Sequence, residues 1–379
     1  MSEATATQGL SVPFLDLGSS HAPLADVILD DIAELIRSNA FTNGPAVAEF
    51  EHAFAAFCGS KICVGVGSGL DALRLALHAL GVGPGDEVVV PAATFIATFE
   101  AVSQVGATPV PADVDEADYT LATDAAAAAV THRTRAVMPV HLYGQLADMT
   151  RLGELARTRS LAIVEDACQA HGADRNGVRA GEVGVAAAFS FYPGKNLGAF
   201  GDAGALITDD ERLAEQVRAL REHGQRLKYH HDVIGYTSRL DTIQAAVLRH
   251  KLPLLNEWNE SRREAARRYS EQLAGVGDLI LPAVPCGSHP VWHLYVIRTR
   301  ERDGLADWLR THGIGVGLHY PQPVHLSAAY SSLGYAPGAF PVTERLATEA
   351  LSLPIFPGIT DEQLSAVVDA VRAYFDRGR

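Results

Sequence analysis

The feature that most limits the possible folds of this chain is a regular alternation of short strand-like runs with segments of helical periodicity. After the first run, Leu70, Leu73, Leu77 and Leu80 fall on one face of a helix. Strands separated by helices predict right-handed crossovers and a mostly parallel sheet, covered on both faces, with ligands at the carboxyl ends of the strands. The runs expected to form strands are KICVGV (61–66), DEVVVP (86–91), ATPVPADV (107–114), RAVMPVHL (135–142), LAIVED (161–166), AAAFSFY (186–192) and AGALIT (203–208).

The character of the chain changes after about residue 235. A long charged helical stretch covers 239–274 with a break at Pro253, and a smaller set of strands and helices follows up to a closing helix after Thr360. We therefore expect a large α/β domain over 1–238, which includes the N-terminal segment, and a smaller C-terminal α/β domain over 239–379 that begins with the long helix.

Charge and hydropathy exclude several function classes. The 379 residues include 31 Lys and Arg against 45 Asp and Glu, a net charge of −14, which repels nucleic acid and anionic lipid. No window reaches the ~18 uninterrupted apolar residues of a membrane helix, and the N-terminus lacks the pattern of a signal peptide. The four cysteines form no Cys-x-x-Cys pair, which is typical of reduced structural thiols. We expect a cytoplasmic protein that binds neither nucleic acid nor membrane.

One lysine stands in an unusual turn. The stretch SFYPGKNLGAFGDAGAL (190–206) places Lys195 among prolines and glycines between two apolar runs. The lysine could be a solvated loop charge, a phosphate anchor or a nucleophile. A Walker A loop is excluded, because Phe189 stands where its first glycine should be and Asn196 follows the lysine.

A second glycine turn follows the first expected strand. Gly67, Ser68 and Gly69 come just before a helix, where backbone N–H groups and the helix dipole form an anion site. A simple tight turn explains these residues equally well. The dinucleotide motif G-x-G-x-x-G fails because position 70 is leucine, and a nucleophile elbow fails because Val66 stands two residues before the serine.

Two carboxylates end the strand LAIVED. Glu165 and Asp166 place at least one negative charge at the ligand edge of the sheet, where a buried carboxylate needs a cationic partner. A helix cap is the ordinary alternative for Asp166. Asp166, Cys168 and His171 match no zinc spacing, and we expect no metal.

Pyridoxal phosphate (PLP) is the cofactor that needs these groups together. Lys195 would form the imine, Asp166 would keep the ring nitrogen protonated, and Ser190 with the turn at 67–70 would hold the phosphate. Phe95 follows another strand and could stack on the ring, although an isolated aromatic is more often part of the core.

The sequence resembles the DegT/DnrJ/StrS group of nucleotide-sugar aminotransferases over nearly its whole length. The most specific pieces are VGSGLDALRLAL, DEVVVPAATFIATFEAV, PVHLYGQLADM, VEDACQAHGA, SFYPGKNLGAFGDAGA and GYTSRLDTIQAAVL. The resemblance implies an α/β fold like that of aspartate aminotransferase (PLP fold type I), with a large domain built on a mostly parallel mixed sheet and a smaller C-terminal α/β domain. It implies Lys195 and Asp166 as catalytic residues, and these cofactor contacts: Gly67, Ser68, Gly69, Leu70, Phe95, Asp166, Gln169, Ser190, Lys195 and Thr237.

Two positions depart from the family pattern. Leu70 stands where the family often has threonine, so a backbone N–H must replace a phosphate hydroxyl there. Thr237 stands where asparagine commonly contacts the phosphate of the neighbouring subunit's cofactor, so cofactor affinity could be lower or a water could intervene. The segment GYTSRLD also implies a homodimer with shared active sites.

The resemblance further implies transfer of an amino group, usually from L-glutamate, to the keto group of a nucleotide sugar, with the cofactor passing through pyridoxamine phosphate (PMP). The motifs are most similar to those of the branch that acts on dTDP-3-keto-6-deoxyhexoses. A 4-keto sugar aminotransferase, a PLP/PMP-dependent sugar dehydratase and a non-catalytic PLP-binding regulator are the alternatives; the lysine at 195 argues against the dehydratase. The candidate substrate contacts, each of which could instead be a solvated loop residue, are Tyr192, Lys228, Tyr236, Arg239, His319, Tyr320 and His325.

Overall fold

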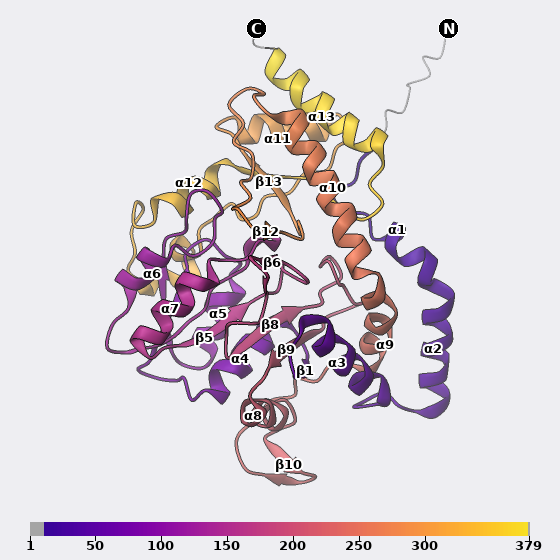
Figure 1. Ribbon diagram of the computed structural model, residues 1–379, viewed down its shortest axis with the longest axis vertical. Helices are drawn as coiled ribbons and strands as arrows, with labels where there is room; N and C mark the ends of the chain where they lie inside the picture. The colour runs from indigo at the N-terminus through magenta and orange to yellow at the C-terminus, as the bar shows by residue number, and fades with distance from the viewer. Residues whose placement is uncertain (1–10, 378–379) are drawn as a thin grey trace.

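The computed structural model describes residues 11–377, and its centre is a seven-stranded mixed sheet (Figure 1). All strands run in one direction except β9, which pairs antiparallel with both of its neighbours. The spatial order is β1 (Ile62–Val66), β9 (Gly204–Thr208), β8 (Ala186–Ser190), β5 (Ala162–Asp166), β4 (Thr134–Val137), β2 (Glu87–Pro91) and β3 (Thr108–Ala112). The carboxyl ends of β1, β2, β5 and β8 therefore meet at one edge.

Two layers of helices cover the sheet because successive side chains of each strand point to opposite faces. Val88 and Val90 pack on the face covered by α4 (Gly69–Ala79), α5 (Ala97–Gln104) and α8 (Glu211–Arg221), whereas Val89 packs on the other face. That second face is covered by α3 (Pro45–Cys58), α6 (Thr123–Ala129), α7 (Met149–Arg159) and α9 (Thr242–Lys251).

A separate apolar cluster lies in the C-terminal part. There α10 (Leu255–Leu273), α11 (Arg302–Thr311) and α13 (Asp361–Asp376) pack with the strand pair β13 (Tyr295–Arg298) and β14 (Ala350–Leu353). The predicted break at Pro253 is the 3₁₀ turn η3 (Leu252–Leu254), which separates α9 from α10. Helix α9, which follows the predicted domain boundary at residue 238, packs in the core of the main sheet. The division of the chain into domains 1–238 and 239–379 stays a prediction, and the start of the first range and the end of the second lie outside the described residues.

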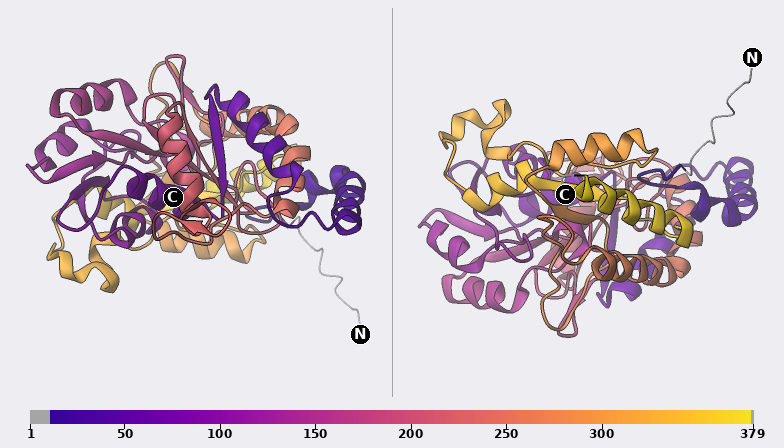
Figure 2. Two further views of the ribbon diagram at one scale, coloured as in Figure 1. Left: turned by 90° about the horizontal axis from the view of Figure 1, so that it is seen from below. Right: turned by 90° about the horizontal axis from the view of Figure 1, so that it is seen from above.

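Several shorter elements complete the fold. In Figure 1 the hairpin of β10 (Gln225–Leu227) and β11 (His230–His231) projects beyond α8. In both views of Figure 2, α2 (Ala25–Ser38, indigo) stands at one side of the molecule. The other elements are α1 (Gly18–His21), η1 (Ala22–Leu24), η2 (Leu142–Gly144), β6 (Asp174–Arg175), β7 (Val178–Arg179), β12 (Ser288–His289), η4 (Val324–Leu326), η5 (Ala328–Leu333) and α12 (Pro341–Glu349).

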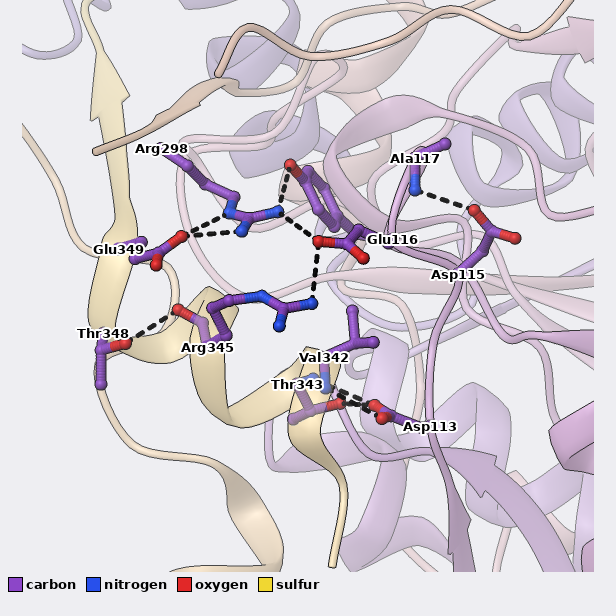
Figure 3. Close-up of polar contacts among 11 residues, drawn as sticks. Asp113, Asp115, Glu116, Ala117, Arg298, Val342, Thr343, Arg345, Thr348 and Glu349 are labelled. Atoms are coloured by element: carbon purple, nitrogen blue, oxygen red, sulfur yellow. Dashed lines mark hydrogen bonds and ion pairs between the residues drawn. The ribbon is translucent and has the colours of Figure 1, made fainter. Parts of the chain in front are cut away.

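A polar cluster joins α12 and β13 to the loop that follows β3 (Figure 3). Asp113 accepts hydrogen bonds of 3.0 Å from the first-turn N–H groups of Val342 and Thr343 in α12. Arg298 forms an ion pair of 2.7 Å with Glu349 and lies 3.8 Å from Glu116. These contacts fix the C-terminal elements on the sheet. Within residues 11–377, no helix has the length and apolar character that a membrane span requires.

Candidate functional site

A cavity of about 660 Å³ lies at the carboxyl edge of the sheet, between the strand ends and the C-terminal elements. Eleven of the predicted site residues line it, from strand ends, connecting loops and the C-terminal part. They are Ser68, Gly69, Leu70, Phe95, Asp166, Gln169, Ser190, Tyr192, Lys195, His319 and Tyr320. Sequence positions from 68 to 320 thus meet at one place.

One end of the cavity is the N-terminus of α4. Ser68 caps this 11-residue helix, because its Oγ accepts a hydrogen bond of 3.1 Å from the N–H of Asp71. Gly69 has no room for a side chain, since a Cβ there would stand 2.5 Å from Sγ of Cys168 and 2.9 Å from Cβ of Ser190. The turn therefore brings bare backbone to the cavity, and free N–H groups with the positive end of the helix dipole form an anion site.

Lys195 lies on the turn that follows β8. Its backbone N–H donates to the carbonyl of Tyr192 at 2.8 Å, while its Nζ has no hydrogen-bond or ion-pair partner among residues 11–377. Burial lowers the pKa of the ammonium, and Cys168 and Asp166 act in the opposite direction. The side chain is thus an unpaired amine that faces the cavity and loses its proton more easily than an ordinary lysine.

The two carboxylates of β5 face different surroundings. Asp166 is 6 % exposed, lines the cavity and accepts a hydrogen bond of 2.8 Å from the hydroxyl of Thr98. No cation of the described chain forms an ion pair with it, so the predicted cationic partner is missing. The fully buried Glu165 is structural, because it accepts from Nε2 of His141 at 2.8 Å and from the loop N–H groups of Gly181, Val183 and Gly184.

Gln169 and Tyr320 form one polar wall. Oε1 of Gln169 accepts from the N–H of Tyr143 at 2.7 Å, and Nε2 donates to the hydroxyl of Tyr320 at 3.2 Å. The ring of Phe95 lies 5.4 Å from that of Tyr320 and is 51 % exposed, which leaves an aromatic surface in the cavity. His319 is bonded at Nδ1 to Ser352, and burial with the nearby charge of Lys195 lowers its pKa to about 4.

Six predicted residues do not line this cavity. Gly67 lies just behind the helix turn, where its N–H donates to Oγ of Ser238 at 3.3 Å. His325 is buried, and its ring contacts Glu344 at 3.3 Å. The other four lie on or near the loop that carries the β10–β11 hairpin. Lys228 contacts the ring of Tyr229, Tyr236 contacts Arg74 and His78, Thr237 contacts His223, and Arg239 contacts Glu222. The roles assigned to these six residues stay predictions.

The structure adds residues that the sequence did not indicate. Thr94 and Thr98 are linked by a hydrogen bond of 2.7 Å and back up Asp166. In the sequence, the only sign of this pair is that the two threonines stand four residues apart shortly after a strand, a spacing that only weakly indicates one face of a helix. His293 lines the cavity from the C-terminal part, and Glu100 and Asp202 add two carboxylates to its wall. Among the described lining residues Lys195 is the one lysine or arginine, so this wall alone carries little positive charge for an anionic substrate.

Comparison with known proteins identifies the group to which this architecture belongs. Residues 24–372 match the DegT/DnrJ/EryC1/StrS aminotransferase family. The chain belongs to this family. The predicted family membership is confirmed, and with it the interpretation of the chain as an aminotransferase.

Three relatives illustrate the family match. The chain is 49% identical over 366 residues, 97% of each chain, to dTDP-3-amino-3,4,6-trideoxy-alpha-D-glucose transaminase of Streptomyces venezuelae. It is similar to the crystal structure of S. venezuelae DesV in complex with a ketimine intermediate, with TM-score 0.95, 49% identity, and coverage of 97% of this chain and 99% of that one. The crystal structure of ntda from Bacillus subtilis with bound cofactor PMP matches with TM-score 0.91, 30% identity, and coverage of 98% and 86%. These matches confirm the predicted aminotransferase fold.

Proposed function

We propose that this protein uses PLP to move an amino group from an amino-acid donor, L-glutamate, to the 3-keto group of a dTDP-linked 6-deoxyhexose. The chemistry of the cavity supports the cofactor. The relative named for a dTDP-3-amino-3,4,6-trideoxy sugar, 49% identical over nearly the whole chain, supports the substrate class. The same name supports amination at carbon 3 over the 4-keto alternative.

The groups around the cavity fit PLP. The N-terminus of α4 with Ser68, Gly69 and Ser190 would hold the phosphate, Phe95 would face the ring, and Asp166 would hold the ring nitrogen. Bound PLP supplies the electron sink that stabilises negative charge at the substrate carbon. One observation carries this assignment. An amine and a carboxylate, Lys195 and Asp166, line the same cavity, and neither has an ion-pair partner in the described chain.

Lys195 would then have two tasks. As a free amine it binds the cofactor covalently, and the lowered pKa favours the neutral, nucleophilic form. Once the donor has displaced it, its Nζ can accept and return the proton at the substrate carbon, which is general acid–base work typically worth ~10²–10⁴-fold in rate.

Asp166 is suited to hold a proton on a ring nitrogen. It is buried, its Oδ2 is oriented by Thr98, and its charge has no cation within ion-pair distance in the described chain. A pyridinium N–H would satisfy this carboxylate, and the attraction between the two charges favours the protonated ring. The helix-cap alternative accounts for one weak contact only, the 3.3 Å bond to the N–H of Cys168.

A homodimer with shared sites belongs to the same proposal. A diphosphate and a dicarboxylate donor need cations, whereas the wall of this cavity offers Lys195 alone among the described residues. The exposed β10–β11 loop carries Lys228 together with Leu227 (65 % exposed) and Ile234 (90 % exposed). On α2, Leu29 and Ile36 are 61 % and 59 % exposed. Such apolar surface fits a second copy, which would bring Lys228, Thr237 and Arg239 to the partner's cavity.

The substrate proposal is tested by regiochemistry. The purified protein is given 3-keto and 4-keto dTDP-6-deoxyhexoses separately with L-glutamate, and the position of the new amine is located by NMR. Because misplacing the reacting carbon by ~1 Å costs ~10²-fold, one regioisomer should dominate strongly, and we expect the 3-keto sugar. Faster turnover of the 4-keto sugar would overturn the assignment to carbon 3 and leave the aminotransferase chemistry intact.

A further inference from the structure

Asn259 is a buried amide of α10, 1 % exposed, that the function assigned above does not use. Its Oδ1 accepts a hydrogen bond of 2.9 Å from Nδ2 of Asn196, the residue next to Lys195. Its Nδ2 donates at 2.8 Å to the backbone carbonyl of His171, on the turn that follows Asp166. One side chain of α10 thus contacts both the turn that carries the amine and the turn that follows the carboxylate of the proposed site.

Backbone carbonyls fix the orientation of these two amides, because a carbonyl only accepts hydrogen bonds. The atom of Asn259 that faces the carbonyl of His171 is therefore the nitrogen, and its oxygen faces Asn196. Asn196 uses its second amide hydrogen for the carbonyl of Val291 at 2.8 Å, and its oxygen accepts from Nδ1 of His293 at 3.2 Å. Both amides are bonded through nitrogen and oxygen, so neither can turn without breaking hydrogen bonds.

The two turns lie beyond the part of the sheet that pairs their strands. The register of β5 with β8 ends at Asp166. His171 and Lys195 each stand five positions after the end of their strand. There the turns are joined by the Asn259 bridge and by the ring of His171, whose Nε2 donates to the carbonyl of Ser190 at 2.9 Å. Side-chain contacts therefore continue the work of the strand ladder.

The approach of α10 to the turn after β5 depends on a glycine. Gly172 has a φ of 87°, in the left-handed region that side chains disfavour. A Cβ there would also stand 3.2 Å from Nδ2 of Asn259 and 3.1 Å from the ring of Phe57. The missing side chain leaves room for the amide of Asn259 beside the backbone of this turn.

The helix that carries Asn259 is anchored on both sides of it. Leu255 packs in the core of the main sheet, whereas Tyr269 packs in the apolar cluster of the C-terminal part. Between them Arg262, 2 % exposed, donates to the carbonyl of Ile355 at 2.9 Å. The bridge to the two turns therefore starts from a rigid element rather than from a loop, as accurate positioning of a site requires.

We propose that Asn259 is a positioning residue that sets the distance between the amine of Lys195 and the carboxylate of Asp166. It holds one turn through Asn196 and the other through the carbonyl of His171. Both groups act on one cofactor at different atoms, so a shift of ~1 Å in either turn would cost ~10²-fold in rate. The inference rests on the proposed function for its purpose, whereas the spacing is a property of the protein without cofactor.

The first test measures how strongly Asp166 acts on Lys195 in cofactor-free protein. The pKa of Lys195 is obtained from the pH dependence of its acylation by a small anhydride, followed by peptide mass spectrometry. Burial lowers this pKa, whereas Cys168 and Asp166 raise it, so Asp166→Asn should lower it further. In an Asn259→Ala background the same substitution should shift the pKa by less than half as much, because the turns are then free to separate.

Tyr269→Phe is the matched control for the first test. It removes a buried hydrogen bond of 2.9 Å from the same helix to the carbonyl of Pro354 and should leave the effect of Asp166→Asn unchanged. Asn259→Ser is the second variant if Asn259→Ala does not fold, because a single hydroxyl is too short to span both partners. An undiminished shift in a folded Asn259 variant, or no shift of the Lys195 pKa by Asp166→Asn in the native background, would overturn the proposal.

The second test follows the covalent attachment of PLP to the apoprotein by visible absorbance. Asn259→Ala should slow attachment at least ~10-fold, because the amine is no longer held in place, and Tyr269→Phe should not slow it. Equal rates for native protein and Asn259→Ala would contradict the positioning role. Failure of the proposed function would appear separately, as the absence of PLP attachment at Lys195 in native protein, and the first test would still decide whether Asn259 sets the spacing.

Discussion

Thr98 of α5 donates a hydrogen bond of 2.8 Å to Oδ2 of Asp166 at the end of β5. The same hydroxyl is bonded to Thr94, four residues earlier, at 2.7 Å, so two threonines fix one side of the carboxylate. Among residues 11–377, the one hydrogen bond to Oδ1 is the long 3.3 Å contact from the N–H of Cys168. Asp166 is therefore held in one orientation by the protein and keeps most of the acceptor capacity of Oδ1 for a ligand.

Thr98→Val should lower kcat by roughly 10- to 100-fold, because a hydrogen bond to a charged group is worth ~1.5–3 kcal/mol. The shape of the side chain is kept, but the same bond contributes to folding, so the free energy of unfolding should fall by a similar amount and activity is compared where both variants are fully folded. Steady-state kinetics and urea unfolding measure the two. Thr98→Ser keeps the hydroxyl and is the matched control. Equal activity of the valine and serine variants would show that the orientation of Asp166 does not depend on this bond.

Gly69→Ala should weaken binding of PLP at least tenfold. The new Cβ would stand 2.5 Å from Sγ of Cys168, so the turn that carries the anion site must shift. Equilibrium dialysis of the cofactor against the apoprotein measures the effect. Adding Cys168→Ala removes the nearest atom and should restore part of the affinity, although the 2.9 Å approach to Ser190 remains. No recovery in the double variant would mean that the Cys168 contact is not what excludes a side chain.

The free energy of unfolding should fall as the pH is lowered from about 6.5 toward 4. Burial lowers the pKa of His171 to about 3, and its ring donates to the carbonyl of Ser190 at 2.9 Å. In this window the unfolded chain, with a histidine pKa of ~6.5, binds a proton that the folded chain does not. Each such histidine contributes up to ~1.4 kcal/mol per pH unit. Urea unfolding at pH 7, 6 and 5 measures the slope. His171→Gln should reduce it, whereas the exposed His52→Gln should leave it unchanged.

Glu349→Gln should destabilise the protein by about 3 kcal/mol, because it leaves the guanidinium of Arg298, 3 % exposed, without the negative charge of its main partner. Glu116→Gln, at an exposed position 3.8 Å from the same arginine, should cost less than ~1 kcal/mol (Figure 3). Thermal or urea unfolding gives both values. A similar small cost for the two variants would show that solvent reaches Arg298 and that the contact does not hold β13 on the sheet.

Much of the site could be predicted because it follows from the direction of the strands. Asp166 and Ser190 are the last residues of β5 and β8, and the turn at 67–70 follows β1. These strands run in the same direction, so their carboxyl ends share an edge. Lys195 was conspicuous because its turn is rich in glycine and proline. The pattern of helices and strands located these residues without any knowledge of side-chain contacts.

The remaining residues could not be predicted because long-range packing decides their position. His293 contacts Asn196 across 97 positions of sequence, and no local pattern marks that pairing. His325 shows the reverse case, because it stands in a suitable loop but turns inward to Glu344. For Lys228 and Arg239 the proposed contacts lie in a second copy of the chain, so the prediction about these two residues is a prediction about assembly.

The most direct test of the account is reduction of the purified protein with sodium borohydride, followed by proteolysis and mass spectrometry. If Lys195 binds PLP covalently, the protein is yellow, reduction abolishes its visible absorbance, and the peptide that contains Lys195 carries the reduced cofactor. Lys195→Ala should keep some cofactor through the α4 anion site but carry no label and have no turnover. A label on another lysine, or no label in native protein supplied with PLP, would contradict the central claim.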